Sequence, residues 1–314
     1  MDEQVDKIPE VVVLAGTTAS GKTDVSIPLA QRLGAEIINA DSRQVYRELR
    51  IGSAPPSKAQ LDAVKHHFVA SKSISERWTA GDFAREARQV INDRCSFGRR
   101  TLVVGGSMLY LRALIDGLYT VDDEPLIDYL ALRREWERRG AEEMLRELQS
   151  IDADIAGKTR VNDYHRVMRA IGVYRATGYR LSELRSRPTT ALTARFRMFF
   201  LYGDRTETYA RVNERVDRML EAGLVDEVKG LWQNGYDESN TNALRTHGYQ
   251  EVFPFLRGEY DFGVMRDKIK QAVRHYVKRQ LTWYRNDARV QKVERSFADS
   301  ADEIAIRIYS ELNE

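Results

Sequence analysis

Short apolar runs alternate with amphipathic stretches over much of the chain. The apolar runs cover residues 11–15, 35–40, 67–70, 101–104 and 196–202. The stretches 22–33 and 80–94, which lie between them, carry apolar residues at helical spacing. Strands that alternate with helices predict an α/β fold, in which a parallel sheet is covered on both faces by helices.

The alternation stops between the fourth and fifth runs. From about residue 124 to 187 there is no strand pattern, and two charged, helix-forming stretches occupy 125–149 and 162–185. We therefore expect an all-helical insertion at 121–190 within a core formed by 1–120 and 191–314. The second part of the core is mostly helical after residue 207, with helices expected at 208–221, 224–234 and 262–286.

A phosphate-binding loop follows the first apolar run. The sequence Gly16, Thr17, Thr18, Ala19, Ser20, Gly21, Lys22, Thr23 fits G-x-x-x-x-G-K-[ST] between a predicted strand and a predicted helix. Glycines let the backbone N–H groups of such a loop face phosphate oxygens at a helix N-terminus. Lys22 is expected to reach the outer phosphates and the Thr23 hydroxyl to bind Mg²⁺. The loop predicts a P-loop NTPase-like core without deciding which phosphate compound it holds.

Charge is unevenly distributed although the formal net charge is only +2. Residues 160–187 have a local net charge of +5 and residues 266–289 one of +6. Two basic segments are typical of nucleic-acid binders, but two solvated helix faces would give the same pattern. The chain has one cysteine, no apolar stretch long enough to span a membrane and an acidic N-terminus, so we expect a cytoplasmic protein.

Three further groups are candidates for chemistry. Asp41 ends the second predicted strand beside the loop, where it can bind Mg²⁺ or accept a proton, or can simply cap a helix. Gly105, Gly106 and Ser107 close the fourth strand and fit either a ligand contact or a plain turn. Arg211 and Arg215 share a helix face and fit either a pyrophosphate clamp or a salt-bridged surface.

The last predicted helix combines a core face with a basic stripe. Met265, Ile269, Ala272, Val273, Tyr276, Leu281 and Tyr284 repeat at helical spacing. Lys270, Arg274, Lys278 and Arg285 fall in one sector of about 80° on the same helix. Such a stripe is typical of contact with a phosphate backbone, which we expect here, although a solvated helix face is the alternative.

Together these motifs resemble the bacterial tRNA dimethylallyltransferases, also called tRNA isopentenyltransferases. The family's loop G-P-T-A-S-G-K-T corresponds to residues 16–23, D-S-x-Q-V-Y to 41–46 and V-G-G-T-x-x-Y to 104–110. Its N-D-x-x-R-x-x-R-A corresponds to 162–170, R-V-D-x-M-L-x-x-G-L to 215–224, G-Y-x-E to 248–251 and K-R-Q-x-T-W to 278–283. The motifs follow the family's order from residue 11 to about 286.

The resemblance implies a prenyltransferase that uses no ATP. It would transfer the dimethylallyl group of dimethylallyl diphosphate to N6 of adenosine-37, in tRNAs that read codons beginning with U, and release diphosphate. Asp41 matches the general base, Lys22 and Arg215 would stabilise the leaving diphosphate, and Thr23 would hold Mg²⁺. The positions that match tRNA contacts are Asp41, Ser42, Arg43, Gln44, Ser107, His165, Arg166, Val167, Met168, Arg169, Arg245, Thr246, His247, Gly248, Tyr249 and Gln250.

Three departures from the family pattern qualify these expectations. Thr17 stands at the usual proline of the loop, and Ser107 replaces threonine but keeps the hydroxyl. Residues 246–250 stand where R-x-I-G-Y-K/R is more usual, which weakens a basic contact and bears on tRNA preference. The alternatives are an adenylate isopentenyltransferase that acts on free AMP, a P-loop kinase or NTPase, and a non-catalytic RNA-binding protein. The expected partners are tRNA and the prenyl diphosphate, and we expect a monomer.

Overall fold

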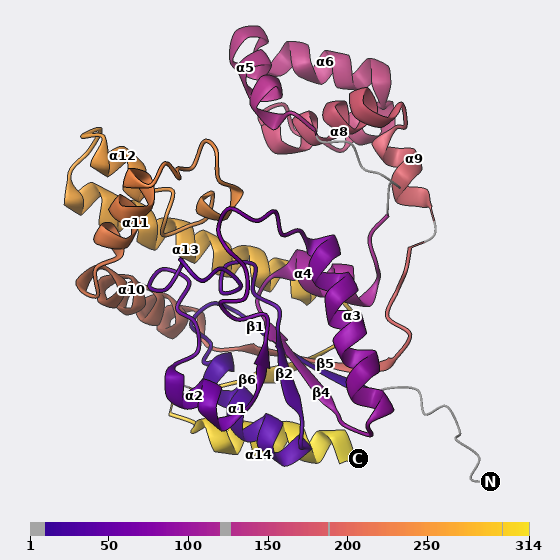
Figure 1. Ribbon diagram of the computed structural model, residues 1–314, viewed down its shortest axis with the longest axis vertical. Helices are drawn as coiled ribbons and strands as arrows, with labels where there is room; N and C mark the ends of the chain where they lie inside the picture. Colours follow the sequence, from indigo (N-terminus) through magenta and orange to yellow (C-terminus); the bar gives the residue numbers. More distant parts are fainter. Residues whose placement is uncertain (1–9, 120–126, 188, 297, 314) are drawn as a thin grey trace. The chain divides into compact units, whose positions relative to one another are not determined.

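The computed structural model describes residues 10–119, 127–187, 189–296 and 298–313. Within them, one parallel sheet has the strand order β3-β2-β4-β1-β5-β6 (Figure 1). The strands are β1 (Glu10–Gly16), β2 (Glu36–Asn39), β3 (His66–His67), β4 (Thr101–Gly105), β5 (Arg195–Tyr202) and β6 (Val290–Glu294). This is the α/β architecture that the alternating pattern predicts.

The helices occupy most of the remaining chain. The first group is α1 (Lys22–Leu33), α2 (Lys58–Ala63), α3 (Ala80–Ser96) and α4 (Met108–Ile115). The second is α5 (Tyr129–Arg139), α6 (Ala141–Ile151), α7 (Ala153–Gly157), α8 (Tyr164–Thr177) and α9 (Leu181–Ser186). The third is α10 (Arg205–Glu221), α11 (Leu224–Gln233), the 3₁₀ turn η1 (Asn242–Leu244), α12 (Val252–Leu256), α13 (Phe262–Arg285) and α14 (Ala301–Asn313).

The chain divides into two compact units, which we call the core unit and the helical unit. The core unit comprises Met1–Ile115 and Leu192–Glu314, and the helical unit comprises Asp116–Ala191. The backbone N–H of Leu192 donates to the carbonyl of Ile115 at 3.0 Å, so the two ends of the core unit meet where the chain leaves and returns. The predicted boundary at 121 lies outside the described residues.

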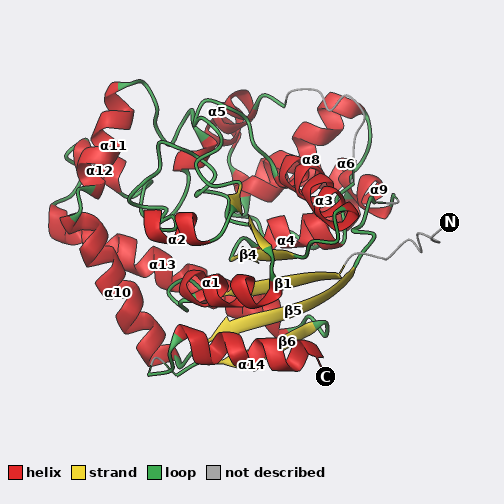
Figure 2. Ribbon diagram, turned by 60° about the horizontal axis from the view of Figure 1, so that its bottom comes forward, coloured by secondary structure: helices red, strands yellow, loops and turns green. Residues whose placement is uncertain are grey.

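Burial explains why the central strands are almost wholly apolar. β1 lies between β4 and β5, and its residues from Val11 onward are buried, as a strand covered by helices on both faces requires (Figure 2). One face of the sheet packs on α1 and α14. The carboxyl ends of the parallel strands share one edge, which is where the loops after β1, β2 and β4 lie.

Several predicted elements need correction. Residues 290–294 form a sixth strand that the sequence analysis missed, because only Val293 of this edge strand is buried and the apolar alternation is weak. The third strand covers only His66 and His67, so the stretch to residue 70 lies outside it. Each of the two predicted helices of the insertion is broken, at Gly140 and near Gly178, where the backbone has positive φ values.

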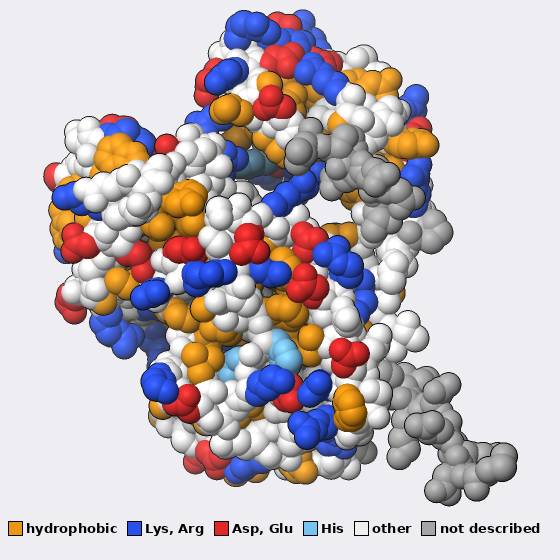
Figure 3. Space-filling model, viewed as in Figure 1, with side chains coloured by type: hydrophobic (Ala, Val, Ile, Leu, Met, Phe, Trp, Pro, Cys, Tyr) orange, Lys and Arg blue, Asp and Glu red, His pale blue; other side chains and the backbone are white. Residues whose placement is uncertain are grey.

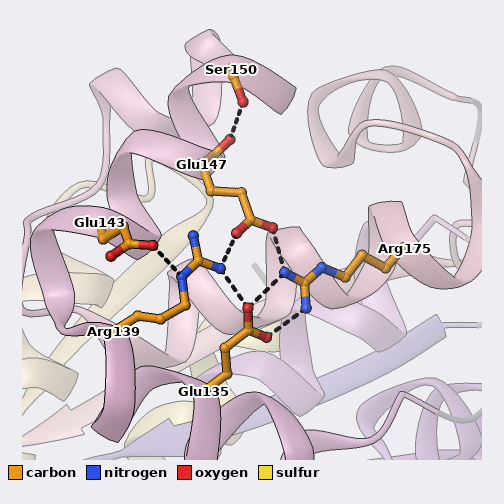
Figure 4. Close-up of polar contacts among 6 residues, drawn as sticks. All are labelled: Glu135, Arg139, Glu143, Glu147, Ser150 and Arg175. Atoms are coloured by element: carbon orange, nitrogen blue, oxygen red, sulfur yellow. Dashed lines mark hydrogen bonds and ion pairs between the residues drawn. The ribbon is translucent and has the colours of Figure 1, made fainter.

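The helical unit has its own apolar core and its own charge network. Leu132, Met144, Leu148, Val167 and Ile171 are among its buried residues. On its surface, five side chains of α5, α6 and α8 connect through ion pairs (Figure 4). The network contains Glu135, Arg139, Glu143, Glu147 and Arg175, with N–O distances of 2.5 to 2.7 Å. It joins three helices that are separate in sequence.

Candidate active site

The loop at 16–23 has the backbone geometry of an anion-binding loop. Ala19 and Gly21 both adopt left-handed conformations, with φ values of 65° and 78°. This conformation is costly for alanine and turns the following amides toward one side. Lys22 and Thr23 begin α1, so their amides have no acceptor within the helix. The loop therefore presents unsatisfied donors at a helix N-terminus, where an anion is favoured.

Two cations without carboxylate partners flank this loop. Lys22 Nζ donates only to the carbonyl of Thr17, at 3.2 Å, and Arg215 has no hydrogen bond or ion pair within the described chain. Burial and, to a smaller extent, the charge of Arg215 lower the pKa of the Lys22 ammonium to about 8, although Asp41 acts in the opposite direction. Burial also lowers the pKa of Arg215, while Asp41 raises it. The three groups thus share one electrostatic site.

Asp41 starts a tight turn at the end of β2. Its Oδ1 accepts from the amides of Arg43 at 2.8 Å and Gln44 at 3.2 Å, while Oδ2 has no partner among the described residues. No helix follows directly, so the carboxylate caps a turn rather than a helix. One oxygen fixes the loop, and the other is available to a ligand.

The loop after β4 is tied to the loop after β2. Ser107 Oγ accepts from the amide of Ser42 at 3.0 Å and donates to Ser42 Oγ at 3.3 Å. Gly105 is required here, because a Cβ at this position would lie 2.2 Å from the carbonyl oxygen of Ala40. Gln44 is held internally, since Nε2 donates to the carbonyls of Ser53 and Ala54. Hydrogen bonds therefore connect the segment at 41–44 to residue 107.

Residues 245–250 are brought to the same site. His247 stacks on Tyr276 with ring centroids 4.5 Å apart, and its ring nitrogens have no hydrogen bond within the described residues. Burial and the nearby charge of Arg43 lower the pKa of His247 to about 4, although Asp41 acts in the opposite direction. Tyr249 donates to Glu227 at 2.7 Å, and the Glu227 carboxylate also accepts from the amides of residues 50–52. This carboxylate holds the 245–250 segment against the loop after β2.

Other members of this segment are engaged locally. Arg245 donates to the backbone carbonyls of Glu238 and Ser239. Thr246 is buried, and its carbonyl accepts from the amides of Tyr249 and Gln250. Gly248 has a φ value of 94° and needs glycine's freedom. The Gln250 side chain is exposed and contacts Glu251 at 3.0 Å.

The basic stripe of α13 is only partly free. Lys270 pairs with Asp217 of α10 at 2.7 Å, and Arg274 donates to Asn213 of α10 at 2.7 Å. Lys278 is exposed and has no partner in the described part of the chain. Lys and Arg are interspersed with Asp and Glu on the face shown in Figure 3. Arg285 is likewise exposed and has no partner among the described residues, so the predicted stripe contains two cations that bind α10 and two that are open to a ligand.

The helical unit carries a separate basic pocket with a volume of about 250 Å³. Its lining residues are Ile155, Lys158, Thr159, His165, Arg166, Arg169, Leu181 and Arg185. Arg169 contacts the hydroxyls of Tyr119 and Tyr129, and Arg166 pairs with Asp163 at 3.2 Å. Val167 and Met168, which were also expected to contact tRNA, are buried in the core of this unit. Only the polar members of this segment face a pocket.

The residues beside the loop are compatible with Mg²⁺. The Thr23 hydroxyl has no hydrogen bond partner within the described residues, and Asp41 has a free oxygen. Mg²⁺ prefers hard oxygen ligands and commonly takes one or two from protein, with phosphates and waters completing its shell. No group of three or more His, Cys, Asp or Glu in the described chain forms a metal cage. The donor set therefore fits a cation that is shared with a phosphate ligand.

Several residues of the site were not found from the sequence. Gln280 and Tyr276 of α13 contact the loops after β1 and β4. The periodicity predicted Leu281 on the buried face of α13, but the structure buries Val277 and Gln280 instead. A glutamine four residues from Tyr276 and four from Tyr284, both predicted core positions, was the available signal. Arg295 donates to the carbonyl of Ser20 at 3.0 Å and had no signal, because its strand was missed.

The chain is similar to known proteins over most of its length. The sequence model of the IPP transferase family matches residues 44–287. The chain is 41% identical to tRNA dimethylallyltransferase 1 of Trichlorobacter lovleyi over 286 residues, which cover 91% of this chain and 93% of the relative. It is similar to the crystal structure of the tRNA isopentenylpyrophosphate transferase of Bacillus halodurans, with a TM-score of 0.70, 33% identity and 97% of each chain covered.

A eukaryotic dimethylallyltransferase, described as acting on tRNA, is also similar in structure. The TM-score is 0.78 at 27% identity, and the match covers 97% of this chain and 79% of that chain. None of the helices in the described residues is long and apolar enough to cross a membrane.

Proposed function

The chain belongs to the IPP transferase family, and from this premise we propose that it is a tRNA dimethylallyltransferase. It transfers the dimethylallyl group of dimethylallyl diphosphate to N6 of adenosine-37 in tRNAs that read codons beginning with U. The observation that carries the proposal is the grouping of Lys22, Arg215 and Asp41 at the phosphate loop. Two unpaired cations suit a diphosphate, and the adjacent carboxylate suits a proton acceptor.

The reaction replaces one bond at the allylic carbon with another. The N6 amine attacks this carbon, the N–C bond forms, and the C–O bond to diphosphate breaks. Asp41 Oδ2 takes the proton that N6 loses, while Oδ1 stays bound to the turn amides. Negative charge grows on the leaving diphosphate, where Lys22, Arg215 and the loop amides stabilise it.

The Mg²⁺ that we propose would be held by Thr23, with Asp41 nearby, and would supply charge neutralisation for the diphosphate. Lys22 has a lowered pKa in the free protein, and a bound anion favours its charged form. The glycines of the loop let the backbone approach the diphosphate closely. Binding of the donor is thus the task of the loop, and proton removal is the task of the loop after β2.

For RNA binding we propose two surfaces. The first is in the core unit and consists of the segments at 41–44, 107 and 245–250 together with the α13 cations Lys270, Arg274 and Lys278. The second is the basic pocket at 165–169 of the helical unit. The target base must leave its stack to reach Asp41, so part of the RNA binding energy offsets unstacking. A cytoplasmic, monomeric enzyme is consistent with a tRNA substrate.

One assay separates this function from its alternatives. Dimethylallyl diphosphate and Mg²⁺ are supplied with unmodified tRNA that carries A36-A37-A38, or with free AMP, and prenyl incorporation is measured. We expect transfer to the tRNA alone. Transfer to AMP alone indicates an adenylate isopentenyltransferase, and ATP hydrolysis without prenyl transfer indicates a P-loop NTPase. RNA binding without any of these reactions indicates a non-catalytic binder.

A further inference from the structure

Gln280 is a fully buried polar side chain on the apolar face of α13. Its exposed fraction is 0%, and its neighbours along this face include Val273, Val277 and Tyr284. An amide in such surroundings is strongly unfavourable unless its donors and acceptor are hydrogen bonded. The position is a poor choice for glutamine if the side chain only fills space.

The amide makes three hydrogen bonds, all to the backbone of loops at the site. Oε1 accepts from the amide of Thr18 at 2.9 Å. Nε2 donates to the carbonyl of Gly106 at 3.0 Å and to the carbonyl of Gly16 at 3.4 Å. These partners also fix the orientation of the amide, because a carbonyl accepts only from Nε2 and an N–H donates only to Oε1.

The surroundings are shaped to admit this side chain. A Cβ at Gly106 would lie 2.6 Å from Gln280 Nε2, so a larger residue there would displace the amide. Tyr276, one helical turn earlier, also donates to the Gly106 carbonyl, at 3.0 Å. Two residues of α13 thus hold the loop after β4, and one of them reaches the loop after β1.

The contact with Thr18 bears directly on the phosphate loop. Because the Thr18 amide is bound by Gln280, it faces α13 and is not available to a phosphate. The left-handed residue Ala19 follows immediately, so the orientation of the later amides is set from this point. The side-chain amide of Gln280 also binds the Gly106 carbonyl, in the loop that carries Ser107. Ser107 in turn accepts from the amide of Ser42, in the turn that Asp41 starts.

We propose that Gln280 is a positioning residue that clamps the phosphate loop to the Gly106 loop and thereby sets the geometry of the diphosphate site. This inference rests on the proposed function only in taking diphosphate as the ligand of the loop. Gln280 itself touches neither donor nor acceptor. It connects α13 to the phosphate loop and to the loop after β4.

The test uses two substitutions and a matched control in the full-length protein. Gln280→Met keeps the approximate volume and removes all three hydrogen bonds. Gln280→Glu keeps the acceptor, and when protonated it also keeps one donor. Gln271→Met changes an exposed glutamine on the same helix and serves as the control. The readouts are calorimetric binding of inorganic pyrophosphate with Mg²⁺, binding of tRNA without donor, and thermal unfolding.

For Gln280→Met we expect pyrophosphate affinity to fall by about tenfold or more, since buried backbone groups lose their partners. The tRNA affinity of Gln280→Met, and both affinities of Gln271→Met, should stay within about twofold of wild type, a change too small to reflect a lost hydrogen bond. The thermal unfolding of Gln271→Met should match that of wild type. In prenyl transfer, KM for the donor should rise more than KM for tRNA. Pyrophosphate affinity of Gln280→Met equal to that of wild type would overturn the proposal.

Gln280→Glu supplies a readout that loss of packing would not move. Its carboxyl is neutral at acidic pH and can donate to Gly106, whereas the ionised form repels the two carbonyls. Its pyrophosphate affinity relative to wild type should therefore rise as pH falls from 8 toward 5. If the pyrophosphate affinity of Gln280→Glu relative to wild type did not depend on pH, the proposed clamp would be contradicted. This test holds even if Gln280→Met folds poorly. If wild type binds pyrophosphate but transfers no prenyl group, the proposed function fails while the clamp stays testable.

Discussion

The two units use arginine in opposite ways. In the helical unit, Arg139 and Arg175 are surrounded by glutamates at 2.5 to 2.7 Å, and their charges are balanced within the protein (Figure 4). In the core unit, Arg215 has no carboxylate partner in the described chain and lies close enough to Lys22 to lower the pKa of the lysine. The first arrangement joins helices. The second holds two like charges close together, and the nearby Asp41 compensates them only in part.

The difference separates stabilising charges from binding charges. A balanced network contributes to folding and needs no ligand, although each exposed pair contributes little. Unbalanced, partly buried cations are unfavourable in the free protein and become favourable when an anion arrives. We therefore expect substitutions of the charged residues at the phosphate loop to affect activity, and substitutions in the ion-pair network of the helical unit to affect stability.

The largest effect is expected from Asp41→Asn. The amide keeps an oxygen for the turn but cannot take a proton, so turnover should fall by roughly 10²–10⁴-fold. The affinity for tRNA and the free energy of unfolding should be almost unchanged, as measured by filter binding and denaturant titration. Asp62→Asn, which alters an exposed carboxylate, is the control. Unchanged turnover would show that Asp41 forms the turn but takes no proton in the reaction.

Arg215→Met should be next in size. Loss of one cation at the leaving group should lower turnover by roughly 10²–10³-fold. Because the substitution also removes repulsion on Lys22, the protein should be as stable as wild type or more so. Single-turnover kinetics and urea unfolding give the two quantities, with Arg218→Met of the same helix as the control. A clear loss of stability would place Arg215 among the structural arginines.

Arg175→Met should give the reverse pattern. Glu135 and Glu147 would lose a partner, and we expect the free energy of unfolding of the helical unit to fall by about 1–2 kcal/mol. Prenyl transfer to tRNA at low temperature should change little. Arg133→Met, which removes an exposed pair with Glu137, should cost less than about 0.5 kcal/mol. Equal effects of the two substitutions would show that the network adds nothing beyond separate pairs.

Acid should weaken the same network. The hydrogen bonds from Arg175 and Arg139 lower the pKa of Glu135 from 4.5 to about 2. A carboxylate with a depressed folded-state pKa stabilises the fold above pH 4.5, and this stabilisation is lost as pH falls toward 2. Between pH 4.5 and 2, the free energy of unfolding of wild type should therefore fall by about 1 kcal/mol more than that of Glu135→Gln, with solvent screening included. Parallel pH dependences of the two proteins would contradict the assignment.

The smallest effect compares two lysines of α13. Lys278 is exposed and unpaired within the described residues, whereas Lys270 is paired with Asp217. Lys278→Ala should lower the slope of log affinity against log salt for tRNA by about 1, and Lys270→Ala by less. Equal slopes for the two variants would show that the ion pair with Asp217 opens when RNA binds.

Strong local signals made much of this structure predictable. The sheet follows from apolar runs such as 101–104, and the anion loop follows from a motif between a strand and a helix. β6 was not predicted, because a largely exposed edge strand has little apolar periodicity. The ion pair of Lys270 was not predicted either, because its partner Asp217 lies on another helix, far away in the sequence. Pairings over long sequence separations come from packing.

The hydrogen bond between Leu192 and Ile115 has a topological consequence. The core unit closes on itself at the point where the helical unit is inserted, so the order of its strands does not depend on what the intervening chain contains. A module whose two ends meet adds little loop-closure entropy to the fold that receives it. The helical unit can therefore be exchanged, shortened or replaced by a brief linker while the sheet and the phosphate loop keep their connectivity. The length and sequence of the insertion can therefore vary without any change in how the strands of the core unit are connected.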